Sequence, residues 1–390
     1  MKSISIILFL FLSIFFIGCK KQPVRTSSNQ NQDEITGKEN DDNSKNLSAD
    51  KLDEMIGQMI MIGINDRKSI LPTDTLLTEI KSGKVGGIIF FEKNISPTAS
   101  AETLKKLIND LQKSASTPLF ISVDEEGGKV HRLKEKYGFV KMPSAEYLGK
   151  FKTTDSTTFY TTQLAKELKD LGFNLNYAPC LDLALNKANP IIAKVGRSYS
   201  ADPDVVAQQA TASIKAHHEQ GIKTIVKHFP GHGSSSSDSH QGIVDVTHQW
   251  NIIELMPYKE LIQSGNIDAV MTAHIINAHL DSTKLPGTLS KVIVTDILRD
   301  MLEFKGVVFS DDMQMYAISK NYGLENAIKL SILAGVDVLV FGNNVTITDR
   351  IKASEIHAII KKLVLSGEIP ESRIIEAYKR IIDLKNKKVN

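Results

Sequence analysis

The residues most able to do chemistry gather in one stretch, between Lys227 and His240. It reads Lys-His-Phe-Pro-Gly-His-Gly, then four serines, then Asp-Ser-His. The apolar residues 224–226 precede it, and its proline, glycines and serines predict a loop. A buried strand that ends in a polar loop is where α/β enzymes place their catalytic groups.

Two kinds of chemistry fit this stretch. Asp238 and His240 are two residues apart, so in an extended segment they project to the same side. The carboxylate could orient the imidazole for proton transfer. Alternatively, His228, His232, Asp238 and His240 could bind a metal ion. Lys227 argues against a metal, because its charge would repel a cation.

Polar residues also follow other apolar runs. Asp124 and Arg132 flank a glycine pair after one run and could grip hydroxyl groups, although a surface charge cluster is the alternative. Asp311 follows another run, and we expect it to be functional. Asp312 is instead expected to cap a helix that starts near Met313.

Other polar residues carry weaker signals. His274 also follows an apolar run, whereas Arg197 alone is more typical of a surface or ion-paired arginine. His217 and His218 are expected at the surface of a helix. Cys180, between Pro179 and Leu181, is expected to be a small buried side chain.

The elements that would position these residues alternate between short apolar runs and longer amphipathic stretches. One helix is predicted to start at Asp202-Pro203 and to run to Gly221. Eight strand–helix units predict a (β/α)8 TIM-type barrel, with a doubly wound open sheet as the alternative. The expected strands are residues 58–64, 87–91, 119–123, 174–178, 224–227, 269–272, 306–309 and 338–341. A barrel would bring their polar carboxyl ends to one mouth.

The N-terminus predicts an envelope protein. Lys2 and the apolar run 4–17 precede Gly18-Cys19, and this run is short for a membrane span. It resembles a bacterial lipoprotein signal, which implies cleavage after residue 18 and a lipid anchor on Cys19; a simple secretory peptide is the alternative. We expect residues 19–48 to be a disordered tether and residues 49–390 to form a single catalytic barrel domain outside the cytoplasm.

Composition excludes some functions. The chain has 390 residues, 42% hydrophobic and 24% charged, which is typical of a globular protein. Its formal net charge of +2 gives no reason to expect a nucleic-acid partner. We expect a monomer that needs no cofactor and no metal ion.

Taken together, the motifs resemble glycoside hydrolase family three, in its β-N-acetylglucosaminidase branch. The resemblance rests on the 124–128 motif with Arg132, on Gly196-Arg197-Ser198, on the 227–240 stretch and on Ser310-Asp311. It implies a (β/α)8 barrel and a retaining mechanism.

The resemblance also implies roles for single residues. Asp311 would be the nucleophile, and His240, oriented by Asp238, would be the general acid and then the base. The sugar's hydroxyls and its N-acetyl group would be bound by Asp124, Arg132, Arg197, Lys227 and His228. We expect the loop of residues 233–240 to be mobile.

The expected substrate is an amino-sugar oligosaccharide, with terminal β-linked GlcNAc of peptidoglycan fragments as the first choice. Within the family, a β-glucosidase or a GlcNAc phosphorylase remains open. Outside it, the alternatives are a metal-dependent barrel hydrolase and a non-catalytic wall-binding lipoprotein.

Overall fold

The computed structural model describes residues 48–239 and 242–389. These residues belong to one compact unit, Leu47–Asn390. The predicted signal peptide, Cys19 and His240 lie outside the described residues, as does the predicted tether except for Ser48. Ser48 caps the first helix, α1 (Ala49–Gln58), by accepting a hydrogen bond from the backbone N–H of Lys51.

The core is a closed barrel of eight parallel strands in the order β1-β10-β9-β7-β5-β4-β3-β2. This confirms the barrel prediction, and each strand falls on one of the expected apolar runs. The barrel strands are β1 (Ile60–Gly63), β2 (Gly87–Phe90), β3 (Phe120–Val123), β4 (Leu175–Asn176), β5 (Lys223–Phe229), β7 (Ala269–Thr272), β9 (Val307–Asp312) and β10 (Val338–Phe341). Two strands run further than expected: β5 continues to Phe229 and β9 to Asp312.

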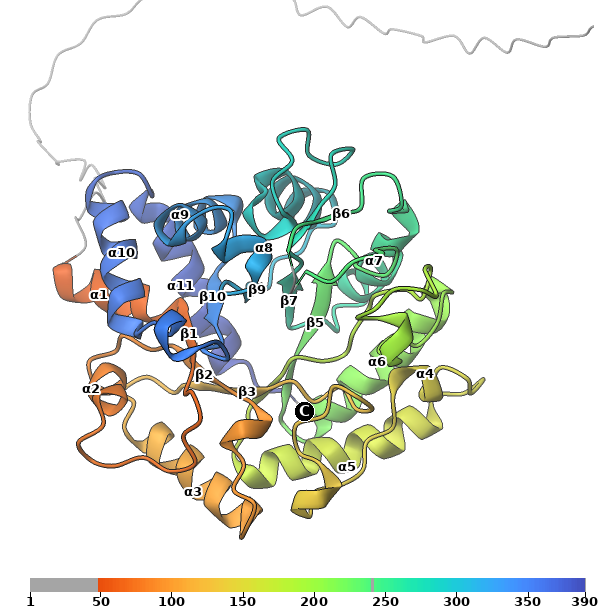
Figure 1. The fold of residues 1–390 in the computed structure, drawn as a ribbon, viewed down its shortest axis with the longest axis horizontal. Helices are drawn as coiled ribbons and strands as arrows, with labels where there is room; N and C mark the ends of the chain where they lie inside the picture. The colour runs from red at the N-terminus through yellow and green to blue at the C-terminus, as the bar shows by residue number, and fades with distance from the viewer. Residues whose placement is uncertain (1–47, 240–241, 390) are drawn as a thin grey trace, which may run out of the picture. The chain divides into compact units, whose positions relative to one another are not determined.

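Helices surround the barrel on its outside (Figure 1). The predicted start at Asp202 is confirmed, because its side chain accepts from the backbone N–H of Asp204 and Pro203 is the first helical residue. The longer helices are α3 (Ser100–Lys113), α5 (Asp155–Leu171), α6 (Pro203–Glu219), α7 (Met256–Gln263), the π-helix η6 (Val292–Met301), α9 (Leu324–Ala334), α10 (Ala353–Leu365) and α11 (Glu371–Asn386). Among the helices of residues 48–239 and 242–389, none has the length and apolar character needed to cross a membrane.

The barrel interior is filled by side chains, so it is a core and not a channel. Phe309 packs edge-on against Phe120 and Tyr177, with ring centroids 5.9 and 6.2 Å apart. Met61 and Ser122 complete this layer through their contact with each other. The barrel interior therefore leaves no room for a ligand between the strands.

Two features differ from the expectation. A small sheet of β6 (Val244–Asp245) and β8 (Ile275–Ile276) was not predicted, because neither of its short strands coincides with an expected apolar run. The prediction of a surface position was wrong for His217, which is 1% exposed. The buried face of α6 holds it against β4, where its Nε2 is 3.0 Å from Asn176 Nδ2. Burial lowers the pKa of His217 to about 4.

Candidate active site

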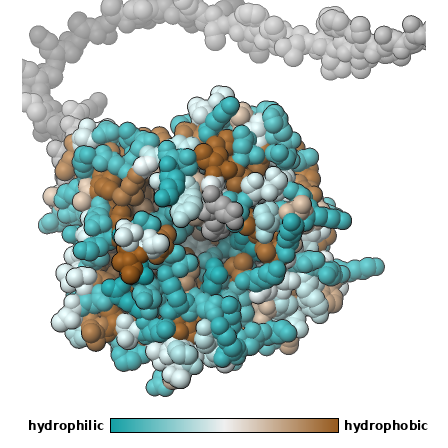
Figure 2. All heavy atoms as spheres, in the orientation of Figure 1, coloured by the Kyte–Doolittle hydropathy of each residue, from teal (hydrophilic) through white to brown (hydrophobic). Residues whose placement is uncertain are grey.

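A cavity of about 760 Å³ lies at the carboxyl ends of the barrel strands. Figure 2 shows a hollow near the centre of a largely hydrophilic face. Every predicted sugar-binding residue lines the cavity, as do Asp238 and Asp311. These residues are Asp124, Arg132, Arg197, Lys227 and His228. The barrel thus brings together side chains from β5 and β9, from the segments that follow β3 and β5, and from the loop that precedes α6.

Lys227 is the most deeply buried cation of the cavity wall, with 2% of its surface exposed. It is held by β5, and its Nζ lies 2.7 Å from Asp124 Oδ1 and 2.7 Å from Glu126 Oε1. Burial alone would lower the pKa of Lys227, but these two carboxylates outweigh burial and raise it. Lys227 therefore carries its charge at the cavity wall.

Asp124 follows β3 and contacts two cations. Besides Lys227, it has Arg132 Nη2 at 3.5 Å from its Oδ2. Burial alone would raise the pKa of Asp124, but the charges of Lys227 and Arg132 hold it below its ordinary value. An ionised carboxylate beside a guanidinium can accept from one sugar hydroxyl while the guanidinium donates to another.

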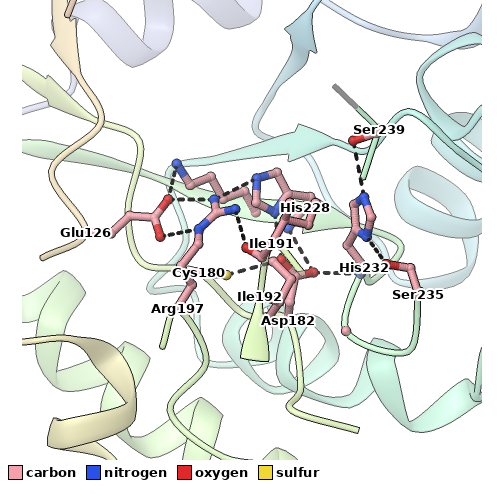
Figure 3. Close-up of polar contacts among 12 residues, drawn as sticks. Glu126, Cys180, Asp182, Ile191, Ile192, Arg197, His228, His232, Ser235 and Ser239 are labelled. Carbon is pink, nitrogen blue, oxygen red and sulfur yellow. Dashed lines mark hydrogen bonds and ion pairs between the residues drawn. The ribbon is translucent and has the colours of Figure 1, made fainter. Parts of the chain in front are cut away.

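Arg197 is fixed by a two-pronged ion pair with Glu126. Its Nε and Nη2 donate to the two carboxylate oxygens at 2.8 and 2.7 Å, and its Nη1 donates to the carbonyl of Ile191 (Figure 3). Burial works against ionisation, but the pairing lowers the pKa of Glu126 and raises that of Arg197. The expectation that Arg197, taken alone, is a surface or ion-paired arginine is confirmed in its second form, because Arg197 is ion-paired and nearly buried.

His228 is oriented by two neighbours. Its Nδ1 lies 2.6 Å from Asp182 Oδ2, and Arg197 Nη2 donates to its Nε2 at 3.2 Å. These contacts place the ring hydrogen on Nδ1 and leave Nε2 as an acceptor. Burial would raise the pKa of Asp182, but His228 outweighs burial and lowers it.

Asp311 occupies the penultimate position of β9 and lines the cavity. Its Oδ1 accepts from the backbone N–H of Asp312 at 2.7 Å. The capping prediction for Asp312 was wrong, because the strand includes it. Its Oδ1 instead accepts from the backbone N–H groups of Gln314 and Gly342, which ties β9 to the end of β10.

His274 contacts the backbone at the same end of β9. It is 1% exposed, and its Nε2 donates to the carbonyl of Asp312 at 3.0 Å while its Nδ1 contacts Thr288 Oγ1. A histidine at a strand end thus acts here on the backbone that carries Asp311.

Sequence reasoning missed Glu126 and Asp182. Glu126 lay within the quoted 124–128 motif, but nothing local distinguished it from Glu125. Glu125 turns out to brace the turn, accepting from the backbone N–H groups of Arg132 and Leu133 at 2.6 Å. Asp182 follows the fourth expected strand, so the rule that found Asp124 and Asp311 could also have found it.

The metal-site alternative can be judged on the described residues. His228, His232 and Asp238 do not form a metal-binding group there; the one such group is Cys180, Asp182 and His228. Burial raises the pKa of the Cys180 thiol, which donates to Asp182 Oδ2 at 3.1 Å. Arg197 lies 3.2 Å from His228. A protonated thiol and an adjacent guanidinium make a poor cation site.

The sequence matches the model of the glycosyl hydrolase family 3 N terminal domain over residues 51–384. The β-hexosaminidase of Tolumonas auensis is 36% identical over 265 residues, which are 67% of this chain and 76% of that protein. β-Hexosaminidase A of Pseudoalteromonas piscicida is 31% identical over 327 residues, 78% of this chain and 53% of that protein. A solved glycoside hydrolase family 3 β-N-acetylglucosaminidase from Paenibacillus sp. str. FPU-7 has a TM-score of 0.77 at 33% identity, covering 87% of this chain and 62% of that one. The chain thus spans roughly half to three quarters of the length of these relatives.

Proposed function

Because this chain belongs to glycosyl hydrolase family 3, we propose that it is a retaining exo-β-N-acetylglucosaminidase. The observation that carries this proposal is the cavity that brings together Asp311, Asp238, the buried Lys227 and the nearly buried Arg197. The relatives named β-hexosaminidase and β-N-acetylglucosaminidase support an amino-sugar substrate.

In the proposed complex, the terminal sugar lies against the charged wall of the cavity. Asp124 and Arg132 bind neighbouring hydroxyls. Lys227 and Arg197 donate to the remaining polar groups of the sugar, including its N-acetyl group, and His228 accepts from one of them. Each cation is already held by a carboxylate, so its side chain is ordered before the sugar binds. Such preorganisation reduces the entropy lost on binding.

The first chemical step forms the glycosyl-enzyme. A carboxylate oxygen of Asp311 attacks the anomeric carbon, the bond from that carbon to the glycosidic oxygen breaks, and His240 gives its proton to the departing oxygen. Asp238 orients the ring of His240 and stabilises its protonated form. His240 lies outside the described residues, so its role rests on the motif.

The second step releases the sugar. Water attacks the same carbon, His240 takes a proton from it, and the ester bond to Asp311 breaks. The two inversions leave a β-configured product. A phosphate ion attacking in place of water would give β-GlcNAc 1-phosphate, so turnover with and without phosphate separates hydrolysis from phosphorolysis.

We further propose that the substrate is peptidoglycan fragments and that Cys19 anchors the enzyme to the cell envelope, with the domain outside the cytoplasm. The motif around Cys19 supports this. Metabolic labelling with a fatty-acid analogue should mark the full chain and should fail to mark Cys19→Ala. Equal labelling of both would contradict the anchor.

A comparison of two substrates, made with the full chain, tests the activity. Aryl β-N-acetylglucosaminide should be cleaved at least about tenfold faster than aryl β-glucoside, since each lost polar contact to a buried partner costs a factor of this order. The reverse preference would favour the β-glucosidase alternative.

The nucleophile is tested by Asp311→Ala, which should lower kcat by on the order of 10⁴-fold. Added azide should then enter the vacated space and yield the α-glycosyl azide, because one inversion replaces two. His240→Ala with azide should yield the β-glycosyl azide. The opposite product configurations would exchange the two roles and defeat the assignment.

A further inference from the structure

The loop root, residues 231–235, is held from two sides. From the loop that precedes α6, the buried amide of Asn189 donates to the carbonyls of His232 and Gly233 at 2.8 and 3.2 Å. From the other side, Glu254 accepts from the backbone N–H of Gly233 at 2.8 Å and from the hydroxyl of Ser234. The position of the loop root is therefore fixed by the two segments on either side of it.

His232 connects this loop root to the segment beyond it. Its backbone N–H donates to Asp182 Oδ1 at 2.7 Å. Its ring contacts Ser235 Oγ through Nδ1 at 2.7 Å and Ser239 Oγ through Nε2 at 3.3 Å (Figure 3). The ring thus bridges two serines that are four residues apart.

The serines on the two sides of this bridge differ in their exposure to solvent, as the bridge predicts. Ser235 and Ser239 are 0% and 2% exposed, whereas Ser236 and Ser237 are exposed. The chain therefore turns the two bridged hydroxyls inward and leaves the intervening two in water. A simple polar loop would not need this division.

The ring of His232 is suited to a bridge and not to proton transfer. Burial lowers the pKa of His232 to about 4, against the opposing charge of Asp182. At neutral pH the ring has one N–H and one bare nitrogen, so it donates to one serine and accepts from the other.

We propose that His232 is a positioning residue for the proton transfer. Through its contact with Ser239, His232 fixes the position of the Asp238 side chain at the cavity. Ser239 follows Asp238 directly in the chain, so a displaced Ser239 displaces the carboxylate that lines the cavity and is proposed to orient the acid. His232 acts through Ser239 and does not itself exchange a proton with the substrate. The inference rests on the function proposed above.

The test uses Ser239→Ala in the full chain, with Ser236→Ala as the matched control on the same loop. The substrates are β-N-acetylglucosaminides whose leaving groups range from dinitrophenol to methanol. Dinitrophenolate is a good leaving group and departs without being protonated, whereas methoxide must receive a proton as it departs. The value of kcat/KM reports the step in which the leaving group departs. For Ser239→Ala, kcat/KM should fall about tenfold with the methyl glycoside and less than about twofold with the dinitrophenyl glycoside.

A second pair of variants tests the ring itself. His232→Gln keeps one donor and one acceptor, so it should retain more activity on the methyl glycoside than His232→Leu does. Both should stay close to wild type on the dinitrophenyl glycoside. Ser236→Ala should match wild type throughout.

Two results would overturn the inference. Ser239→Ala could behave like Ser236→Ala, or it could lose the same factor with every leaving group, which would mean a role in binding or folding. Failure of the proposed function looks different: the wild-type protein would then leave all the β-N-acetylglucosaminides uncleaved.

Discussion

Both ends of the barrel bury ionised side chains, but they pair them differently. At the mouth, Lys227 lies between Asp124 and Glu126 beside the cavity. At the amino ends of the strands, Asp337 precedes β10 and contacts three guanidinium groups. They belong to Arg299 of η6 and to Arg373 and Arg380 of α11.

The difference lies in how completely each carboxylate is bonded. Asp337 Oδ1 accepts from Arg373 and Arg380 at 2.8 and 3.2 Å, and its Oδ2 accepts from Arg299 at 2.6 Å and from the backbone of Val308 at 3.0 Å. At the mouth, Asp124 Oδ2 has Arg132 only at 3.5 Å. A carboxylate whose two oxygens each accept twice stabilises a fold, whereas an ordered but less completely bonded carboxylate can still bind a ligand.

Of the changes that compare the two ends, Asp337→Asn is expected to have the largest effect. The change leaves three cations around a neutral amide, and breaking a buried ion pair costs about 3–5 kcal/mol. The free energy of unfolding, measured in urea, should fall by that amount, while kcat/KM of the folded enzyme stays within about twofold of wild type. Unchanged stability would mean that water can replace the carboxylate, and the contrast between the two ends would disappear.

The matched change at the mouth is Glu126→Gln, which removes the shared partner of Lys227 and Arg197. We expect kcat/KM to fall about 100-fold, since truncating a buried charge partner costs a few kcal/mol at a binding site. Stability should fall less than in Asp337→Asn, because Asp124 still pairs with Lys227 and the cavity admits water. Urea unfolding and steady-state kinetics on the same preparations compare the two variants. A larger loss of stability than of activity would make the mouth cluster a structural one too.

The sequence predicted which residues lie at the barrel mouth better than it predicted the contacts between them. Apolar runs located all eight strands, because parallel strands covered by helices are buried on both faces. Their polar ends then predicted Asp124, Lys227 and Asp311 together. Glu126 could not be assigned, because its partner Arg197 is 71 residues away and only barrel closure brings them together.

The errors have the same origin. His217 carries a polar side chain near a helix end, which predicts exposure, but the turn of α6 aims it at Asn176 of β4. Asp312 has the residue type of a helix cap, but pairing with β10 extends the strand through it. Local pattern predicts the element, whereas the neighbour that a side chain meets depends on packing across the barrel.

The last prediction concerns the amino end of the barrel and the dependence of its stability on pH. Lys385 of α11 donates to Gln58 Oε1 at 2.6 Å and to the carbonyl of Gly86 at 2.8 Å. Burial of the amine lowers the pKa of Lys385 to about 7 from its ordinary 10.5. Between these values the unfolded chain binds more protons than the folded one, so the folded state gains stability as pH rises.

Lys385→Met lacks this titration. The difference in unfolding free energy between wild type and Lys385→Met should therefore shift in favour of wild type from pH 7 to pH 10, by at most about 1.4 kcal/mol per pH unit. Lys379→Met, which changes an exposed lysine of the same helix, should show no such shift. If the two variants follow the same pH dependence, the amine of Lys385 keeps its proton in the fold, and the amino end would tolerate a positive charge without a carboxylate. In that case, the two ends of the barrel would no longer differ in how completely their carboxylates are bonded. The cavity would be the only difference between them in this comparison.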